Sequence, residues 1–561
     1  MRRKGVPLSP LKGFQTAISS YILANRVETT DTFSAAFAVS RFWKKLEIPD
    51  ASRAAARKRA CWESWQAYDY ALYDLKIGAM PVSRARTAHF QFSRNIKFKQ
   101  YFGDEIFTNG STYVATRGKN SLEEKLQNLE WTITSDCIPL FAELVLRNRA
   151  LKCGLKERCR RYYGSLKAYR CAANAAWRKA PTGLNRYKRA LFVIETHIRN
   201  VIPVVLGSRF GTVPKNNEKD RPINLEPFCN ILVQRSIGIG LRNYIRDCYG
   251  VDLLNAQTEH GSLISQSGKA TLDLSNASDS ITPQLVKLVV PKTVYDLTMA
   301  SRSPYVEHSS GDIHFLNKIS SMGNGFTFEL MTLLLLAVTR YWDKDSRVYG
   351  DDIIVNDTVA QNVIDDLTAV GFQINTDKSF YGDNPFRESC GKNYHRTEGY
   401  IWSFDFRYPV SEVDCIVFFN KLLYLQKYYG LFNDLVEKLS RLIPVALRCN
   451  RFEFATDPLS NVPLDDFFHL VARKRNSPGN FSSQSKDLCY RDFHVFKTYV
   501  LRSKRVNGTD LDMTSDQFGK YFMYLHAGRV TDNVYTGTSK VSLVALIQHD
   551  ENPYALRTSG S

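Results

Sequence analysis

The stretch Arg347-Val348-Tyr349-Gly350-Asp351-Asp352-Ile353-Ile354-Val355 places strand-forming residues on both sides of a Gly-Asp pair. Glycine at the first central position of a two-residue loop is typical of a β-hairpin turn. The predicted hairpin carries two adjacent carboxylates, Asp351 and Asp352, and like charges repel one another unless a cation lies between them. An ordinary exposed turn uses the same residue types, because Asp and Gly both favour turns. The two interpretations differ in what the rest of the chain must supply.

The length and charge of the chain narrow the class of protein. With 561 residues it is long enough for two or three subdomains. Its 44% hydrophobic and 23% charged residues are typical of a globular protein and exclude a disordered one. Lys and Arg number 75 against 56 Asp and Glu, which gives a net charge of +19. This excess indicates a polyanionic partner, usually nucleic acid; a basic soluble protein without such a partner is the alternative.

The cysteines and the apolar runs predict a soluble, intracellular protein. The eleven cysteines are odd in number and never form a CxxC pair, which argues against a secreted disulfide framework. Cys153, Cys159 and Cys171 match no zinc module, so we expect them to be structural. No apolar core of a signal peptide follows the basic residues 1–4. The longest apolar run, residues 333–338, is too short to span a membrane.

The first part of the chain is predicted to be mainly helical. Apolar spacing indicates helices over residues 1–80 and about 121–149, with short strands or an extended arm over 89–117. Amphipathic helices are also expected over about 411–450. A basic face in the first region either contacts RNA or is simply solvated; its cations are Arg53, Arg57, Lys58 and Arg59.

The most basic region runs from Arg147 to Arg199. It holds fifteen Lys or Arg against only Glu157 and Glu195, and aromatic residues are interleaved with the cations. Such a surface suits phosphates and stacked bases, so we expect contact with nucleic acid or nucleotides here. A second cationic segment, residues 213–223, is a polar loop in which Lys215, Lys219 and Arg221 could bind a triphosphate.

Two further segments place candidate groups near strands and turns. Ala270-Thr271-Leu272 predicts a buried strand that ends at Asp273, where sites of α/β type commonly carry their chemistry. Residues 275–280 are cap and turn residues that open a predicted helix, and Asp279 would need no function as a helix cap. In the segment 320–329, glycines flank Asn324 before a predicted helix, which either lets a ribose or phosphate approach the backbone or merely forms a turn.

If the strands that carry Asp273 and the Asp351–Asp352 pair are neighbours, three carboxylates converge. Two hard divalent ions need such oxygen ligands and take substrate phosphates in their remaining positions. In two-metal nucleotidyl transfer the ions activate a 3′-hydroxyl and stabilise charge on the phosphates. The loop that holds Lys215 and Arg221 could then cover the triphosphate, and Lys378 is a candidate proton donor to the pyrophosphate.

The ordered segments VPKNNEKDR, DLSNASDS, SSMGNGFTFE, YGDDIIV, GFQINTDKS and FRESCG closely resemble those of the replicase catalytic subunits of positive-strand RNA bacteriophages, the Qβ-like leviviruses. They look like motifs F, A, B, C, D and E of an RNA-dependent RNA polymerase and cover about residues 213–391. The resemblance implies an α+β right-hand polymerase with an antiparallel palm sheet flanked by helices. The expected domains are fingers over 1–268, palm over 269–410, and thumb with the C-terminal region over 411–561.

The resemblance also implies roles for single residues. Asp273 and Asp351 would bind two Mg²⁺ ions, for which Mn²⁺ can substitute, with Asp352 assisting, and Lys378 would be the general acid. The residues expected to contact the incoming nucleotide are Lys215, Lys219 and Arg221 at the triphosphate, and Asp279, Ser321 and Asn324 at the ribose 2′-hydroxyl. Because the spacing from Asp273 to Asp279 is one residue longer than in many RNA polymerases, Ser278 is expected to share or take over the ribose role.

The implied activity is RNA synthesis on an RNA template, with NTPs as substrates, in the cytoplasm of an infected bacterial host. Host elongation factors Tu and Ts and a ribosomal protein are the implied partners, with no membrane association. A reverse transcriptase is one alternative, although Gly350 before Asp351 and small or polar residues after Asp273 argue against it. A non-catalytic basic RNA-binding protein is the other, and it leaves the three aspartates without a purpose.

Overall fold

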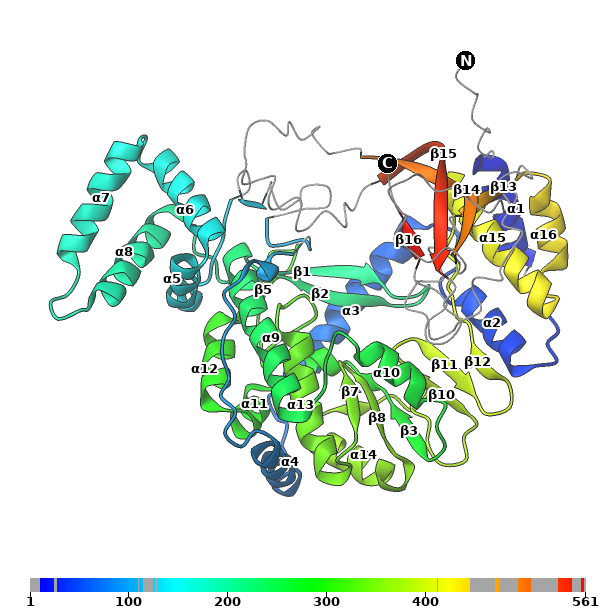
Figure 1. Ribbon diagram of the computed structural model, residues 1–561, viewed down its shortest axis with the longest axis horizontal. Helices are drawn as coiled ribbons and strands as arrows, with labels where there is room; N and C mark the ends of the chain where they lie inside the picture. Colours follow the sequence, from blue (N-terminus) through cyan, green and yellow to red (C-terminus); the bar gives the residue numbers. More distant parts are fainter. Residues whose placement is uncertain are drawn as a thin grey trace, which may run out of the picture.

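The computed structural model describes residues 11–24, 28–108, 110–114, 125–126, 130–410 and 412–443, together with strands in the ranges 470–474, 493–505, 533–546 and 556–558. Helices are mixed with several separate, largely antiparallel sheets (Figure 1), which confirms the expected α+β class. Within these ranges no helix has both the length and the apolar character needed to cross a membrane.

A three-stranded antiparallel sheet lies at the centre. Its strands are β3 (Lys269–Leu272), β8 (Asp352–Asn356) and β7 (Arg347–Tyr349), with β8 in the middle. Ile353, Ile354 and Val355 of β8 are almost completely buried, as expected for a central strand. Tyr349 pairs with Asp352, so the predicted two-residue hairpin loop is confirmed.

The apolar helix that follows the Gly-Asn-Gly segment forms the core beside this sheet. It is α13 (Thr327–Trp342), which contacts α4 (Ala79–Phe92), α9 (Phe228–Tyr249) and α14 (Ala360–Ala369). Because neighbours surround it, its side chains from Leu330 to Arg340 are all buried. The helix predicted to follow the Gly-Asn-Gly segment is thereby confirmed.

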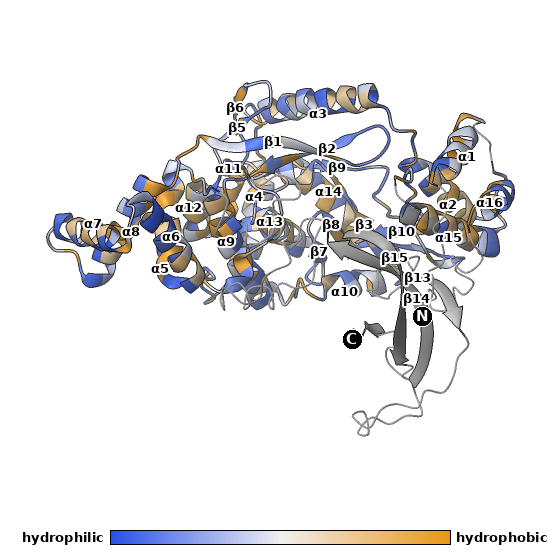
Figure 2. Cartoon of the chain, turned by 90° about the horizontal axis from the view of Figure 1, so that it is seen from above, coloured by the Kyte–Doolittle hydropathy of each residue, from blue (hydrophilic) through white to orange (hydrophobic). Residues whose placement is uncertain are grey.

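A second sheet carries the cationic loop. Its strand order is β2 (Asp220–Leu225), β1 (Gly207–Pro214), β5 (Tyr305–Glu307) and β6 (Ile313–Phe315), with β1 and β5 parallel. Helix α3 (Ala51–Ala71) runs along β1 and β2 (Figure 2). Trp62 and Trp65 of α3 pack against Phe210 of β1, with ring centroids 4.7 and 5.3 Å apart.

The first two helices belong to a separate hydrophobic cluster. Helices α1 (Leu11–Ala24) and α2 (Phe33–Lys44) pack against α15 (Glu412–Tyr429) and α16 (Asn433–Ser440), at the right of Figure 1. Phe42, for example, lies 4.3 Å from Phe432 between ring centroids. Helices were predicted in both regions. The predicted domain boundaries, however, separate α1 and α2 from the helices with which they share this cluster.

The basic region forms helices that project at the left of Figure 1. They are α5 (Ile138–Arg147), α6 (Arg149–Tyr162), α7 (Leu166–Lys179) and α8 (Arg186–Val201). Glu157 pairs with Arg160 and Arg161, and the contact with nucleic acid expected here stays a prediction. Among the cysteines expected to be structural, Cys159 is buried, whereas Cys153 and Cys171 are exposed.

Two local predictions were wrong or incomplete. Residues 89–92 continue α4, and in the described part of 93–114 the backbone forms no strand; Asn109 and residues 115–124 lie outside the description. Residues 275–280 do not open an α-helix. Leu274 and Ser275 form the short strand β4, paired with β9 (Gln373–Ile374), so the following residues make only a 3-10 turn over Ala277–Asp279.

The remaining elements complete the described fold. They are α10 (Ala256–Leu263), α11 (Pro283–Val289), α12 (Lys292–Ser301), the antiparallel sheet β10 (Phe386–Ser389), β11 (Lys392–His395) and β12 (Gly399–Ile401), and the sheet β13 (Leu470–Lys474), β14 (Phe493–Arg505), β15 (Asn533–Leu546) and β16 (Leu556–Thr558).

Candidate active site

The pairing of β3 with β8 brings two of the predicted acids together. Leu272 pairs with Ile353, so the next residues along the two strands, Asp273 and Asp352, face each other across the ladder. Asp351 lies in the adjoining turn. All three are half-buried, at the end of the central sheet.

These carboxylates share a negative electrostatic environment. Burial raises the pKa of Asp273, and the charge of Asp351 raises it further. Burial and the same Asp351 charge raise the pKa of Asp352 to about 7. In the described residues, no three His, Cys, Asp or Glu side chains stand close enough to hold a metal ion as they are placed. The oxygen donors and their mutual repulsion nevertheless fit a hard divalent cation.

Asp273 is held from the segment that follows β9. The side-chain amide of Asn375 donates to Oδ2 of Asp273 at 2.6 Å, and the backbone N–H of Asn375 donates to the Asp273 carbonyl oxygen at 2.9 Å. The hydroxyl of Ser379 accepts from the Asp273 backbone N–H at 3.1 Å. Sequence reasoning missed both residues, although they flank Lys378 in a segment that it singled out.

Gly350 has two reasons to be glycine. Its φ of +63° lies in the left-handed region, which side chains with a Cβ disfavour. A Cβ at this position would also lie 2.7 Å from the ring of Phe328. Its N–H donates to the hydroxyl of Thr332 at 3.0 Å. The turn that presents Asp351 is therefore fixed against α13.

The turn between β10 and β11 reaches the same acids. The backbone N–H of Cys390 donates to the Asp352 carboxylate and opposes the rise of its pKa. Glu388 lies 3.8 Å from the ammonium group of Lys378, the predicted general acid. Glu388 also raises the pKa of Asp273 by its charge, while Lys378 lowers it. Cys390 and Glu388 are thus further members of the site that sequence reasoning did not select.

The cationic loop between β1 and β2 lies within electrostatic reach of the acids. Partial burial lowers the pKa of Lys215, and the charges of Arg221, Lys378 and Lys219 lower it further, whereas Asp273 raises it. The three predicted triphosphate ligands therefore share one field with Asp273 and Lys378.

Helices α2 and α3 support this loop. The N–H of Asn217 donates to the carbonyl of Lys44 at 3.2 Å, and the guanidinium of Arg57 donates to the carbonyl of Asn217 at 3.1 Å. Arg57 also pairs with Glu47 at 2.7 Å and with Asp220 at 3.5 Å. Arg57 is therefore engaged in holding the loop, whereas sequence reasoning offered only RNA contact or solvation.

The Gly-Asn-Gly segment packs on the end of β2. A Cβ at Gly323 would lie 2.3 Å from the Asn224 carbonyl oxygen, and the φ of Gly323 is +106°. Asn324 is buried and hydrogen-bonds to the fully buried Glu226. The hydroxyl of Ser321 is buried without a hydrogen-bond partner in the structure. A buried hydroxyl without a hydrogen-bond partner is energetically costly.

Asp279 is placed by contacts that its sequence neighbours did not suggest. Its Oδ1 lies 2.8 Å from Nζ of Lys318 and accepts from the indole N–H of Trp65 at 3.1 Å. The hydroxyl of Ser278 lies 3.4 Å from Oδ2, which is a long and therefore weak hydrogen bond. Ser278 itself is half-buried. The proposed sharing of the ribose role by Ser278 stays a prediction.

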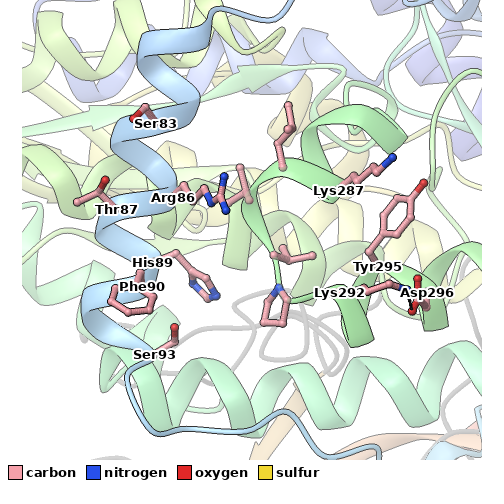
Figure 3. A pocket seen from close by; sticks show the side chains of 14 residues that line it. Ser83, Arg86, Thr87, His89, Phe90, Ser93, Lys287, Lys292, Tyr295 and Asp296 are labelled. Atoms are coloured by element: carbon pink, nitrogen blue, oxygen red, sulfur yellow. Dashed lines mark hydrogen bonds and ion pairs between the residues drawn. The ribbon is translucent and has the colours of Figure 1, made fainter.

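A separate cavity of about 1030 Å³ lies between α4 and the α11–α12 pair (Figure 3). Arg86 and His89 line it on α4, and Lys287 and Tyr295 line it on the opposite side. His89 is buried and bonded to the Tyr249 hydroxyl at 2.7 Å. None of the predicted site residues lines this cavity, so it is not part of the candidate site.

Comparison with known proteins identifies the family of the chain. A family model described as RNA replicase, beta-chain, matches residues 156–518. The RNA-directed RNA polymerase subunit beta of Enterobacteria phage SP is 31% identical over 379 residues, which are 64% of this chain and 62% of the relative. That of Escherichia virus Qbeta is 40% identical over 223 residues, which are 38% of this chain and 37% of the relative. The matches thus cover less than two thirds of either relative.

Among solved structures, the RNA-dependent RNA polymerase of bacteriophage phi12 aligns with 79% of this chain and 82% of its own, at 13% identity and a TM-score of 0.35. A likeness of that size is too weak to define the fold.

Proposed function

The chain belongs to the RNA replicase beta-chain family, and on that premise we propose that it synthesises RNA on an RNA template by two-metal nucleotidyl transfer. The observation that carries the proposal is the placement of Asp273 opposite Asp352, with Asp351 in the adjoining turn. A non-catalytic RNA-binding protein would have no use for three acids so close together that, besides burial, the charge of Asp351 raises the pKa of Asp273 and of Asp352.

We infer that Asp273 and Asp351 hold two Mg²⁺ ions, or Mn²⁺ in their place, and that Asp352 assists. When bound, these ions supply Lewis-acid activation of the 3′-hydroxyl and neutralise charge on the phosphates. Asn375 and Ser379 orient Asp273, and the Cys390 N–H orients Asp352. These contacts support a preorganised set of ligands.

The cations and polar groups around the acids have complementary roles in this proposal. Lys215, Lys219 and Arg221 bind the triphosphate, and Lys378 donates a proton to the leaving pyrophosphate. The contacts of Asp279 support a role in ribose recognition, which it would share with Ser278, Ser321 and Asn324. The pairing of Lys378 with Glu388 keeps the ammonium group beside the acids.

The proposed architecture is a right hand, with fingers over 1–268, palm over 269–410 and thumb from 411. The antiparallel sheet β3–β8–β7 would be the palm sheet, with α13 and α14 beside it. The packing of α1 and α2 on α15 and α16 supports an arrangement in which the N-terminal helices join the thumb side of the molecule.

The proposed substrates are NTPs and an RNA template, and the product is RNA in the cytoplasm of an infected bacterial host. The projecting basic helices α6–α8 support contact with RNA, because their cations greatly outnumber their acids. Elongation factors Tu and Ts and a ribosomal protein are proposed as host partners on family resemblance alone.

The decisive experiment is Mg²⁺-dependent NTP incorporation on an RNA template by chain purified from the bacterial host. Asp351→Asn should abolish synthesis while RNA affinity is kept or slightly raised, because a negative charge is removed. Asp365→Asn, an exposed position on α14, removes the same charge and should leave synthesis unchanged. Unchanged incorporation by Asp351→Asn would refute the catalytic assignment, and preference for dNTPs would indicate a reverse transcriptase.

A further inference from the structure

Lys318 is a wholly buried lysine that lies between two acids. Its ammonium group is 2.8 Å from Oδ1 of Asp279 and 3.6 Å from Oδ1 of Asp69, and both Lys318 and Asp69 have no exposed surface. The ammonium group also lies 3.9 Å from the centre of the Trp65 ring. A buried ammonium group is stable only when nearby acids or aromatic rings offset the loss of water. The two carboxylates and the Trp65 ring therefore fix the position of Lys318.

Asp69 holds the far side of the cluster. Its Oδ2 accepts from the His314 ring at 2.8 Å and from the Asn317 backbone N–H at 3.0 Å. Burial alone would raise the pKa of Asp69, but the His314 hydrogen bond and the Lys318 charge outweigh it and hold that pKa below its ordinary value. Asp69 therefore stays ionised and anchors Lys318 from α3.

The two oxygens of Asp279 are unequal as a result. Oδ1 receives both the Lys318 charge and the Trp65 indole N–H. Among the residues that the structure describes, Oδ2 has only the long contact with the Ser278 hydroxyl, at 3.4 Å. A carboxylate oxygen has room for further donors, so Oδ2 remains able to accept from a ligand hydroxyl.

The backbone fixes the same arrangement. Ile319 follows Lys318 in the chain, and Ile281 lies two residues after Asp279. The N–H of Ile319 donates to the carbonyl oxygen of Ile281 at 2.8 Å. The neighbouring hydroxyls of Tyr68 and Ser280 lie 2.6 Å apart, which ties α3 to this turn a second time. Helix α3 therefore contacts the Asp279 turn through both Trp65 and Tyr68.

We propose that Lys318 and Trp65 are positioning residues that turn Asp279 so that its Oδ2 accepts from the 2′-hydroxyl of the incoming ribonucleotide. The proposal rests on the proposed function and deepens it, because it assigns sugar selectivity to contacts from α3 and from the segment before the Gly-Asn-Gly loop. Lys318 and Trp65 touch Asp279 and need not touch the nucleotide.

The test compares the ratio of kcat/KM for a ribonucleotide to that for its 2′-deoxy analogue. Trp65→Phe keeps a ring beneath Lys318 but removes the N–H that Asp279 accepts. We expect this ratio to fall about fivefold, roughly the effect of one hydrogen bond to a charged group. The corresponding ratio for a 3′-deoxy analogue should not change. A merely structural defect would lower kcat/KM for all three nucleotides alike and would leave both ratios unchanged.

Trp62→Phe is the matched control, because Trp62 stacks on Trp65 in the same helix and packs on Phe210. It should leave both ratios unchanged. Asp279→Asn should lower the 2′-deoxy ratio at least as much as Trp65→Phe does. Lys318→Met should also lower it, and thermal unfolding will report how far the two unpaired acids destabilise that variant.

The outcomes separate this inference from its premise. Intact RNA synthesis with an unchanged 2′-deoxy ratio in Trp65→Phe would overturn the inference alone. An equal fall for the 2′-deoxy and 3′-deoxy ratios would also overturn it, since the defect would not concern the 2′-hydroxyl. Failure of the unaltered chain to incorporate NTPs on an RNA template would instead overturn the proposed function, on which this inference rests.

Discussion

The side-chain amide of Asn375 lies 2.6 Å from Oδ2 of Asp273, and the backbones of the same two residues are hydrogen-bonded at 2.9 Å. The double contact fixes the carboxylate at the end of β3 from a segment about one hundred residues later in the chain. An amide that donates to a carboxylate stabilises its ionised form, which is the form that binds a cation.

Asn375→Ala should therefore lower kcat for NTP incorporation about tenfold, with RNA affinity unchanged, because groups that orient metal ligands typically contribute at this level. Asn375→Asp should lower kcat further, since it places a like charge beside Asp273. Thr376→Ala, at the exposed neighbouring position, serves as the control. Equal activity of the Asn375 and Thr376 variants in a single-turnover assay would contradict a positioning role for Asn375.

Gly350→Ala should destabilise the protein by about 2–4 kcal/mol, measured by urea unfolding. About 1 kcal/mol comes from the left-handed backbone, and about 1–3 kcal/mol comes from the collision with Phe328. Gly382→Ala is a matched control: its φ is also +63°, but a Cβ there would meet nothing within 4 Å. The difference between the two variants in lost free energy of unfolding measures the cost of the collision. Equal losses would show that the ring of Phe328 moves aside without cost.

The parts of the site that could be predicted from the sequence are those encoded locally. Gly350 and Asp351 form a two-residue turn between strand-forming runs, and Asp273 ends a short apolar strand, so both positions followed from nearby residues. Prediction from nearby residues also explains an error. The cap-like residues 275–280 were expected to open a helix, but strand β9, which is distant in sequence, pairs with Leu274 and Ser275 instead.

The rest of the site depends on contacts between distant segments. Asp69 and Lys318 are separated by more than two hundred residues, and Arg57 reaches Asn217 across 160. No local pattern in the sequence predicts that a lysine will be buried between two acids, because lysine side chains are usually exposed. Glu226 is similar: its environment is created by Ser303, Gln234 and Asn324, from three other segments of the chain.

Glu226 should give the protein a measurable pH dependence of stability. Burial raises the pKa of Glu226 to about 7, although hydrogen bonds from Ser303, Gln234 and Asn324 oppose the rise. In the unfolded chain the pKa is about 4.3. Between these values the folded protein retains a proton that the unfolded chain has lost, so this residue makes stability fall as pH rises from about 4.5 to about 7, and its contribution is constant above that.

Glu226→Gln cannot ionise and should remove this component. The difference in the free energy of unfolding, variant minus unaltered chain, should increase by about 2–3 kcal/mol from pH 5 to pH 8. The limiting slope of this difference is about 1.4 kcal/mol per pH unit. Chemical denaturation at a series of pH values measures the difference. Glu63→Gln, at an exposed position of α3, provides the reference. Parallel pH profiles for all three proteins would show that Glu226 is ionised throughout.

Arg57 should affect nucleotide binding through the cationic loop. Its guanidinium holds the Asn217 carbonyl and pairs with Glu47 and Asp220, and its side chain is only 14% exposed. Arg57→Met keeps much of the aliphatic stem but frees the loop, so the groups on Lys215 and Arg221 must be ordered when the triphosphate binds. We expect KM for NTPs to rise about fivefold to tenfold with kcat changed less than twofold, since loop ordering is a binding cost.

Lys58→Met removes the same charge from the exposed adjacent position and should leave KM unchanged. The pair also separates the two interpretations of this basic helix face. If the face bound RNA, both variants would weaken RNA binding and make it less dependent on salt. A rise in KM for NTPs that is confined to Arg57→Met, with the salt dependence of RNA binding unaltered, would assign Arg57 to the support of the loop.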